Sequence, residues 1–337
     1  MVSSVIDGVR IAGIVSCLPS RREDVTDLGR RFGDDAARKI AKATGIEARH
    51  LASEEQCASD LAYEAARTLL AQMDWTPESI DILIFVSQTH DYILPGSGFL
   101  LHQRLGLGKH CAVFDQGLGC SGYIYGLWTA AGLLRTIGQG RALLLVGDTT
   151  SRLIDPTDRA VAPLFGDAVT ATALTFPDSE AGEWVFQLGS DGAGAPYLMV
   201  KGGGMRYPEQ PPHLFMEGTQ VFAFTLREIP TVLSSVCERA GWTIESVDSV
   251  ILHQANAQMI RHLGQKIGAR SDQLLLALSE YGNTSSASIP LALTEGLATS
   301  LAERPMRLLL SGFGVGWSWG ALALTTAPPI LCRTVFL

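Results

Sequence analysis

A cysteine with the surroundings of a nucleophile lies in the first half of the chain. Cys120 belongs to the segment DQGLGCSGYIYG, where small residues flank the thiol and an apolar helix is predicted over Ser121–Leu134. The start of a helix carries a partial positive charge and unpaired N–H groups, and both favour the thiolate form of a nearby cysteine. Cys120 is therefore a candidate nucleophile, although a cysteine between glycines is more often a packed small residue.

Two polar residues in the second half could work with such a nucleophile. His253 follows the apolar run 250–252 in VILHQANAQMI, so it is expected at the end of a strand and just before a helix. Asn283 lies in YGNTSSASIP, a group of small polar residues that precedes another apolar helix. Taken singly, the histidine is more often a hydrogen-bonded structural residue and the asparagine a turn or helix-capping residue.

A glycine-rich segment, SGFGVGWSWGALAL, follows a strand predicted at 306–310. Its backbone amides could face a ligand, but it lacks the GxxxxGKS or GxxxxGKT pattern of a phosphate-binding loop. The order of a cysteine, a histidine, an asparagine and an amide-bearing loop, each at a strand end or in a loop, is more informative than any one of them.

The elements that must position these residues are short apolar strands alternating with amphipathic helices. This βαβ alternation predicts a largely parallel, buried sheet in each of two similar halves, 1–179 and 180–337. Between the halves, Glu180–Pro212 is rich in glycine and proline and is expected to form irregular loops. The expected strands are 80–87, 112–115, 142–147, 249–252 and 306–311, and the expected helices are 59–73, 121–134, 221–240, 257–267 and 286–300.

Composition and charge narrow the classes of function. The 337 residues are 47% hydrophobic and 18% charged, which is typical of a globular protein with a large interior. A net charge of −8 without a basic run argues against nucleic acid as a partner. No signal peptide and no apolar run of about 18 residues is present, so we expect a cytoplasmic protein without a membrane association. Six scattered cysteines without a CxxC pair predict neither a metal site nor a disulfide framework.

Several segments together resemble the β-ketoacyl-[acyl carrier protein] synthase III family of thiolase-fold condensing enzymes. They occur in the family's order from about residue 44 to about residue 324, so the resemblance covers nearly the whole chain. It implies an α/β fold in which two similar βαβ halves pack as a five-layered α-β-α-β-α sandwich, usually in a homodimer. The segments are TGI at 44–46, GCSG at 119–122, DPTDR at 155–159, FGD at 165–167, HQAN at 253–256, GNTS at 282–285 and WGA at 319–321.

The resemblance also implies a reaction. Cys120 would take an acyl group from a thioester, with the oxyanion held by its own N–H and by an amide of the loop Gly314, Val315 and Gly316. His253 and Asn283 would donate hydrogen bonds to the thioester carbonyl of a malonyl-type extender. The enolate left by decarboxylation would then attack the acyl carbon. Thioesters of coenzyme A or of acyl carrier protein would be the substrates, and no cofactor would be needed.

Some positions near the expected substrate entrance differ from the family's pattern. Lys39 stands where the family usually has a tryptophan that stacks on the adenine of coenzyme A, and Ala43 replaces an arginine. Gln258 replaces another arginine near the pantetheine and carrier-protein entrance, whereas Arg159 and Lys266 match basic positions of the family. The choice between coenzyme A and a carrier protein as acyl donor therefore stays open.

Two differences concern the acyl pocket. Val315 replaces the middle glycine of the loop, so its amide can serve an oxyanion only if its φ angle is negative. Leu94 stands where some relatives have a phenylalanine that reaches into the partner subunit's pocket, which would admit a longer or branched acyl primer.

Other functions on the same fold also fit these residues. An acyltransferase that forms an ester or an amide, a chalcone-synthase-like enzyme and a catalytically silent acyl-binding subunit all stay open. An intact set of Cys120, His253 and Asn283 argues against the silent subunit. Thiolase proper is disfavoured because the loop at 312–316 lacks the second cysteine of that chemistry.

Overall fold

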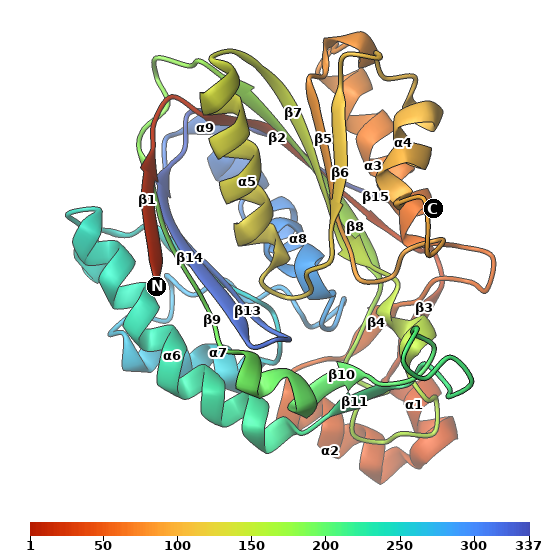
Figure 1. The fold of residues 1–337 in the computed structure, drawn as a ribbon. Helices are drawn as coiled ribbons and strands as arrows, with labels where there is room; N and C mark the ends of the chain where they lie inside the picture. The colour runs from red at the N-terminus through yellow and green to blue at the C-terminus, as the bar shows by residue number, and fades with distance from the viewer.

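Two β-sheets form the centre of the protein in the computed structural model, which describes all residues from 1 to 337 (Figure 1). The first sheet contains, in spatial order, β15 (Leu331–Phe336), β2 (Arg10–Leu18), β8 (Ala168–Phe176), β7 (Gly140–Asp148), β5 (Ile82–Val86) and β6 (Ala112–Gln116). The second contains β1 (Val2–Ile6), β9 (Trp184–Ser190), β14 (Ser318–Thr325), β13 (Arg307–Gly314) and β12 (Ser249–Leu252).

Helices fill the space between the sheets and cover their outer faces. Helices α5 (Gly122–Ile137) and α8 (Ser288–Gly296) lie between the sheets and contact strands of both. The outer face of the first sheet is covered by α3 (Ala58–Gln72) and α4 (Ser97–Leu105), and that of the second by α6 (Gly218–Arg239), with α7 (Ala257–Lys266) packed beside it. This arrangement confirms the predicted five-layered α-β-α-β-α sandwich.

The sequence of each layer fits its position. Helix α5 carries Ile124, Leu127 and Leu134 with alanines and glycines between them, and it is apolar around most of its circumference, as a helix between two sheets must be. Strand β5 reads ILIFV and all five residues are buried, which is typical of a strand covered on both faces. The largest apolar cluster joins α5 and α8 to both sheets.

The ends of the chain cross between the sheets. Strand β1 pairs with β9 at the edge of the second sheet, and β15 pairs with β2 at the edge of the first. The first strand of the half predicted at 1–179 therefore lies in the second sheet, and the last strand of the half predicted at 180–337 lies in the first sheet. Each half is tied to the other by backbone hydrogen bonds as well as by the apolar layer between the sheets.

Three expectations about the strands are corrected. The sheets are mixed rather than largely parallel, because β8 runs antiparallel to both β2 and β7, and β14 runs antiparallel to both β13 and β9. The segment expected to be irregular contains β9, which lies inside the second sheet. The glycine-rich segment is a hairpin of β13 and β14, and only residues 315–317 form its turn.

The helix expected at 286–300 is also interrupted: α8 ends at Gly296 and α9 (Ala298–Glu303) follows. The remaining elements lie around the edge of the sandwich. They are β3 (Arg22–Asp24), α1 (Val25–Phe32), α2 (Asp34–Thr44), β4 (Ala48–His50), β10 (Leu198–Val200) and β11 (Leu214–Met216). None of the helices combines the length and the hydropathy that crossing a bilayer requires.

Candidate active site

Cys120 lies directly before the helix between the two sheets, as predicted. Helix α5 begins at Gly122 with Ser121 as its N-cap, and the cysteine is only 9% exposed. Strand β13 of the other half passes close to it: a Cβ atom on Gly314 would lie 3.1 Å from the Cys120 Sγ and 2.8 Å from its Cβ. The absence of a side chain at Gly314 is therefore what leaves room for the thiol.

Contacts from three elements fix the His253 side chain. The residue follows β12 directly, and its backbone N–H donates to the Ser311 carbonyl at 2.8 Å. Its Nδ1 lies 2.7 Å from the Ser288 Oγ at the start of α8, and its ring packs edge-on against Phe313, with 5.6 Å between the ring centres. The histidine is 2% exposed, so its ring is shielded from bulk water.

The Asn283 side chain presents its amide nitrogen as a free donor. Its backbone is held by Leu164 and Gly166, with N···O distances of 2.8 and 3.1 Å. Its Oδ1 accepts a hydrogen bond from the Ser285 N–H at 3.0 Å. Because the oxygen is engaged in this way, the side chain keeps a fixed orientation, and no protein group accepts from its Nδ2.

Ser285 joins the three predicted residues. Its N–H donates to the Asn283 Oδ1 at 3.0 Å, its side chain interacts with the Cys120 thiol, and its backbone interacts with the His253 ring. Ser285 has a φ angle of 52°, which is uncommon for a residue other than glycine and places its backbone close to these neighbours. The structure therefore brings Cys120, His253 and Asn283 together around a residue that the sequence reasoning did not single out.

The pKa of the Cys120 thiol is raised to about 12, contrary to the thiolate expected from its position at a helix start. Burial is the main cause, because a charged sulfur would lose its water. The negative charge of Asp148 raises the pKa further, and the hydrogen bond from Ser285 only partly opposes it. The loss of water on burial thus favours the thiol form of the resting residue.

Asp148 is the second residue near the site that the sequence reasoning missed. It ends β7 and is 2% exposed. Its Oδ1 accepts hydrogen bonds from the Ser87 hydroxyl at 2.9 Å and from the Gln88 N–H at 2.6 Å, whereas its Oδ2 is buried without a partner. The only signal in the sequence was its place at the end of an apolar strand.

Burial also keeps His253 neutral. It lowers the pKa of the imidazole to about 3, although the interaction with the Ser285 backbone acts in the opposite direction. A neutral histidine can donate one hydrogen bond and accept another. The site thus combines a protonated thiol with two uncharged donors, and it lies in surroundings that strengthen hydrogen bonds to a developing oxyanion.

The turn of the glycine-rich hairpin lies beside Cys120. The φ angle of Val315 is not positive, so the replacement of glycine by valine at this position leaves its amide able to serve an oxyanion. Its side chain packs toward Gly119, where an added Cβ would come within 2.9 Å of the Val315 Cγ1. Gly316 has a φ angle of 132°, which a side chain would strain. Leu94, in contrast, is 79% exposed.

The predicted entrance residues lie on different elements. Arg159 is exposed, with its guanidinium carbon 5.9 Å from the centre of the Phe32 ring. Gln258 is exposed in the first turn of α7, and Lys266 is the last residue of the same helix, about 12 Å further along at 1.5 Å per residue. Helix α2, which carries Lys39 and Ala43, packs against α7.

Similarity to known proteins agrees with this geometry. The family model for 3-oxoacyl-[acyl-carrier-protein (ACP)] synthase III matches residues 114–195, and the model for its C-terminal part matches residues 237–326. A β-ketoacyl-[acyl-carrier-protein] synthase III of Neisseria gonorrhoeae is 35% identical over 316 residues, which cover 94% of this chain and 98% of that protein. The chain belongs to the β-ketoacyl-[acyl carrier protein] synthase III family.

Solved structures of the family support the assignment. A 3-oxoacyl-(acyl-carrier protein) synthase from Burkholderia xenovorans LB400 superposes with a TM-score of 0.97 at 41% identity, covering 100% of this chain and 99% of that one. A synthase III from Pseudomonas aeruginosa PAO1 gives 0.88 at 30% identity, with 96% and 99% covered. The protein is therefore an acyltransferase that joins thioester substrates by decarboxylative condensation in fatty acid synthesis. The rival assignments, an ester- or amide-forming acyltransferase or a silent subunit, are not favoured.

The raised pKa of Cys120 gives a testable pH dependence. Alkylation by iodoacetamide requires the thiolate, which at pH 7 is roughly one part in 100,000 for a pKa of about 12. We expect the alkylation rate of Cys120 to rise about tenfold per pH unit from pH 6 to 9 without a plateau. Asp148→Asn removes a negative charge and should accelerate alkylation at every pH. Peptide mass spectrometry measures both rates.

The matched control is Asp81→Asn, which removes a carboxylate at the opposite end of the same sheet and should leave the rate unchanged. A plateau near pH 7, or a slower reaction in Asp148→Asn, would contradict this account of the thiol.

Proposed function

We propose that Cys120 carries the acyl group and that His253 and Asn283 serve only the condensation step. In the first half-reaction the Cys120 sulfur forms a bond to the thioester carbonyl carbon, the donor's sulfur leaves, and the proton of the Cys120 thiol ends on the released thiol. The Cys120 N–H and a backbone amide of residues 314–316 are the donors for the oxyanion. The contact between Gly314 and the thiol supports this placement.

In the second half-reaction an extender thioester loses carbon dioxide and its carbonyl oxygen becomes an enolate. His253 and Asn283 stabilise that oxygen by donating hydrogen bonds, and the enolate carbon attacks the acyl carbon on Cys120. The bond to sulfur then breaks, and the cysteine takes up a proton. The single observation that carries this proposal is the convergence of all three residues on Ser285.

Ser288 provides the histidine tautomer that this step needs. Its Oγ receives the Gln254 N–H at 3.4 Å and lies 2.7 Å from the His253 Nδ1. Because the Ser288 oxygen accepts a hydrogen bond from the Gln254 N–H, the hydrogen of the Ser288 hydroxyl is free to point at the His253 Nδ1. We propose that Nδ1 accepts this hydrogen and that Nε2 therefore carries the hydrogen donated to the enolate.

The test separates the two half-reactions. Intact-protein mass spectrometry after incubation with a panel of acyl-coenzyme A and acyl carrier protein donors should show one acyl adduct in the wild type and none in Cys120→Ala. His253→Ala and Asn283→Ala should keep the adduct but lose malonyl-carrier protein decarboxylation by about 10²- to 10³-fold, as expected for loss of an oxyanion donor.

His262→Ala changes an exposed histidine of α7 and is the control that should leave both half-reactions intact. Normal decarboxylation in both site variants would refute the roles of His253 and Asn283. The absence of an adduct from every donor would instead favour a silent acyl-binding subunit. The same panel shows whether coenzyme A or a carrier protein is the acyl donor. The family's usual donor cannot be assumed for this chain, because Lys39, Ala43 and Gln258 differ from the family's pattern near the expected entrance.

We also propose that two copies associate through the free edge of the first sheet. Strand β6 is the edge strand, and its outer side has no partner within the chain. Beside it, Tyr92, Ile93, Leu94 and Phe99 are between 55% and 85% exposed. A second copy would pair with this edge and cover the apolar side chains, and the exposed Leu94 would then be placed to reach the other subunit.

The division into halves at 1–179 and 180–337 and the cytoplasmic location remain predictions.

Sedimentation velocity tests the association. The wild type should sediment as a dimer, and Ile93→Asp should shift the population to monomers because a charge would be buried in the contact. Met205→Asp, which changes an equally exposed apolar residue away from β6, should remain dimeric. A monomeric wild type, or a dimer unaffected by Ile93→Asp, would exclude this interface.

A further inference from the structure

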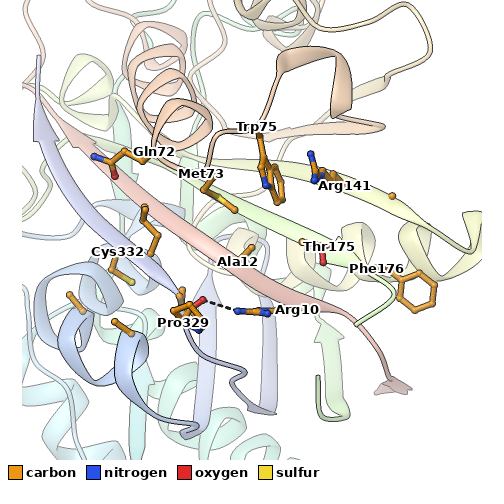
Figure 2. Close-up of a pocket in the computed structure, with 15 residues that line it drawn as sticks. Arg10, Ala12, Gln72, Met73, Trp75, Arg141, Thr175, Phe176, Pro329 and Cys332 are labelled. Atoms are coloured by element: carbon orange, nitrogen blue, oxygen red, sulfur yellow. Dashed lines mark hydrogen bonds between the residues drawn. The ribbon is translucent and has the colours of Figure 1, made fainter. Parts of the chain in front are cut away.

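A groove of about 930 Å³ lies at the end of the first sheet that is opposite the active site. It is bordered by residues of β2, β7, β8 and β15, by the end of α3, and by Ala298 and Ala302 of α9 (Figure 2). Strand β7 begins in the groove at Gly140 and ends at Asp148 beside Cys120, so the two sites are separated by roughly 26 Å at 3.3 Å per residue. The condensation reaction gives this groove no role.

The groove is positively charged. Arg10 and Arg141 are its only charged lining residues. Arg10 is already engaged, because its guanidinium donates to Asp178 at 3.2 Å and to the Pro329 carbonyl at 2.9 Å. It forms one wall of the groove, and its charge is compensated.

Arg141 supplies the uncompensated charge. Its Nη1 donates to the Ser79 hydroxyl at 2.9 Å, and its guanidinium stacks over the Trp75 ring at 4.3 Å. No carboxylate lies within ion-pair distance of this guanidinium, and the nearby Asp81 accepts a hydrogen bond from the Arg141 backbone N–H. Stacking on Trp75 holds the guanidinium plane in place, so its remaining donors are oriented before an anion arrives.

The remainder of the lining is largely apolar. Nine of the fifteen lining residues are hydrophobic, and they include Met73, Phe176, Ile330 and Leu331. Figure 2 shows Met73 and Trp75 on one side of the β2 ribbon, with Arg141 next to Trp75 and Phe176 at the far end. A single fixed cation beside an apolar surface of this size matches a ligand with one anionic end and one apolar chain.

The groove has the features of a binding site rather than of a second reaction centre. Cys332 is its only thiol, and burial raises the pKa of that thiol to about 12. The lining contains neither a histidine nor a carboxylate that could accept a proton. A nucleophile without a base and without a lowered pKa has no means of activation.

We propose that this groove binds an amphipathic carboxylate, of the class of a medium-chain fatty acid, at a site separate from the active site. The carboxylate pairs with Arg141 in the fork geometry that a guanidinium offers, and the chain lies over Met73 and Leu331, which meet beside Gly13. Binding at this site does not depend on Cys120, so it is independent of the acyl-transfer reaction.

Photo-crosslinking locates the bound ligand directly. The full-length enzyme is irradiated with a fatty acid of about ten carbons that carries a diazirine in its chain, and the labelled peptides are mapped by mass spectrometry. We expect labels within residues 72–75 or 329–332, reduced at least tenfold in Arg141→Gln. Arg307→Gln is the matched control, because Arg307 also stacks on a tryptophan, Trp242 at 5.4 Å, but lies outside the groove.

Competition in the wild type gives a second readout that does not depend on a variant. Decanoate should suppress the groove labels, whereas decanol, which lacks the carboxylate, and inorganic phosphate, which lacks the chain, should not. Labels confined to active-site peptides, equal labelling in Arg141→Gln and the wild type, or equal competition by decanol would each overturn the proposal.

Discussion

The exclusion of water from the region between the two sheets is the constraint on which the active site depends. Cys120, His253 and Asn283 are all less than a tenth exposed, and they meet around Ser285 beneath the hairpin of β13 and β14. In such surroundings a charge on any of them is costly, so the thiol keeps its proton and the imidazole stays neutral. The same surroundings make each hydrogen bond to a developing oxyanion stronger than it would be in water.

The exclusion of water affects the two half-reactions differently. Decarboxylation supplies the electron pair for carbon–carbon bond formation, so the second half-reaction needs donors for an enolate oxygen and no strong base. In the mechanism we propose, a neutral histidine and an asparagine supply those donors over a wide pH range. In the mechanism we propose, the cost falls on the first half-reaction, because Cys120 must lose its proton beside Asp148, and only Ser285 and the backbone N–H of Cys120 favour the thiolate. Burial therefore favours the condensation step and slows the activation of the nucleophile.

Much of the architecture could be predicted from local patterns. The strand at 249–252 and the helices near 59–73 and 257–267 follow from the period of their apolar residues, and the structure has them at nearly the same bounds. Periodicity does not reveal which strands pair, so it missed the antiparallel β8 and the exchange of β1 and β15 between the sheets. Glycine-rich composition also misled the prediction for β9 and for the hairpin. A glycine in these strands makes room for a large side chain on the neighbouring strand, as Gly189 of β9 does for Trp319.

The site could be predicted only in part, for a related reason. Cys120, His253 and Asn283 stand in recognisable motifs, and the structure brings them together. Ser285 stands in the same GNTS segment as Asn283, but its proximity to Cys120 and His253, like that of Asp148 to Cys120, joins segments far apart in the chain, and no spacing in the sequence indicates it. The raised pKa of Cys120 is likewise a property of the folded interior, because it comes mainly from burial, which the sequence does not show.

The protonation state of His253 is the most direct test of the central claim. Nitrogen-15 NMR of the imidazole in the wild-type enzyme, followed from pH 5 to pH 8, reports both its charge and its tautomer. A buried imidazole with a pKa of about 3 should stay neutral over this whole range, with the hydrogen on Nε2 and Nδ1 accepting from Ser288. A titration near pH 6.5, or a hydrogen on Nδ1, would contradict the account of a water-excluded site that works with neutral donors.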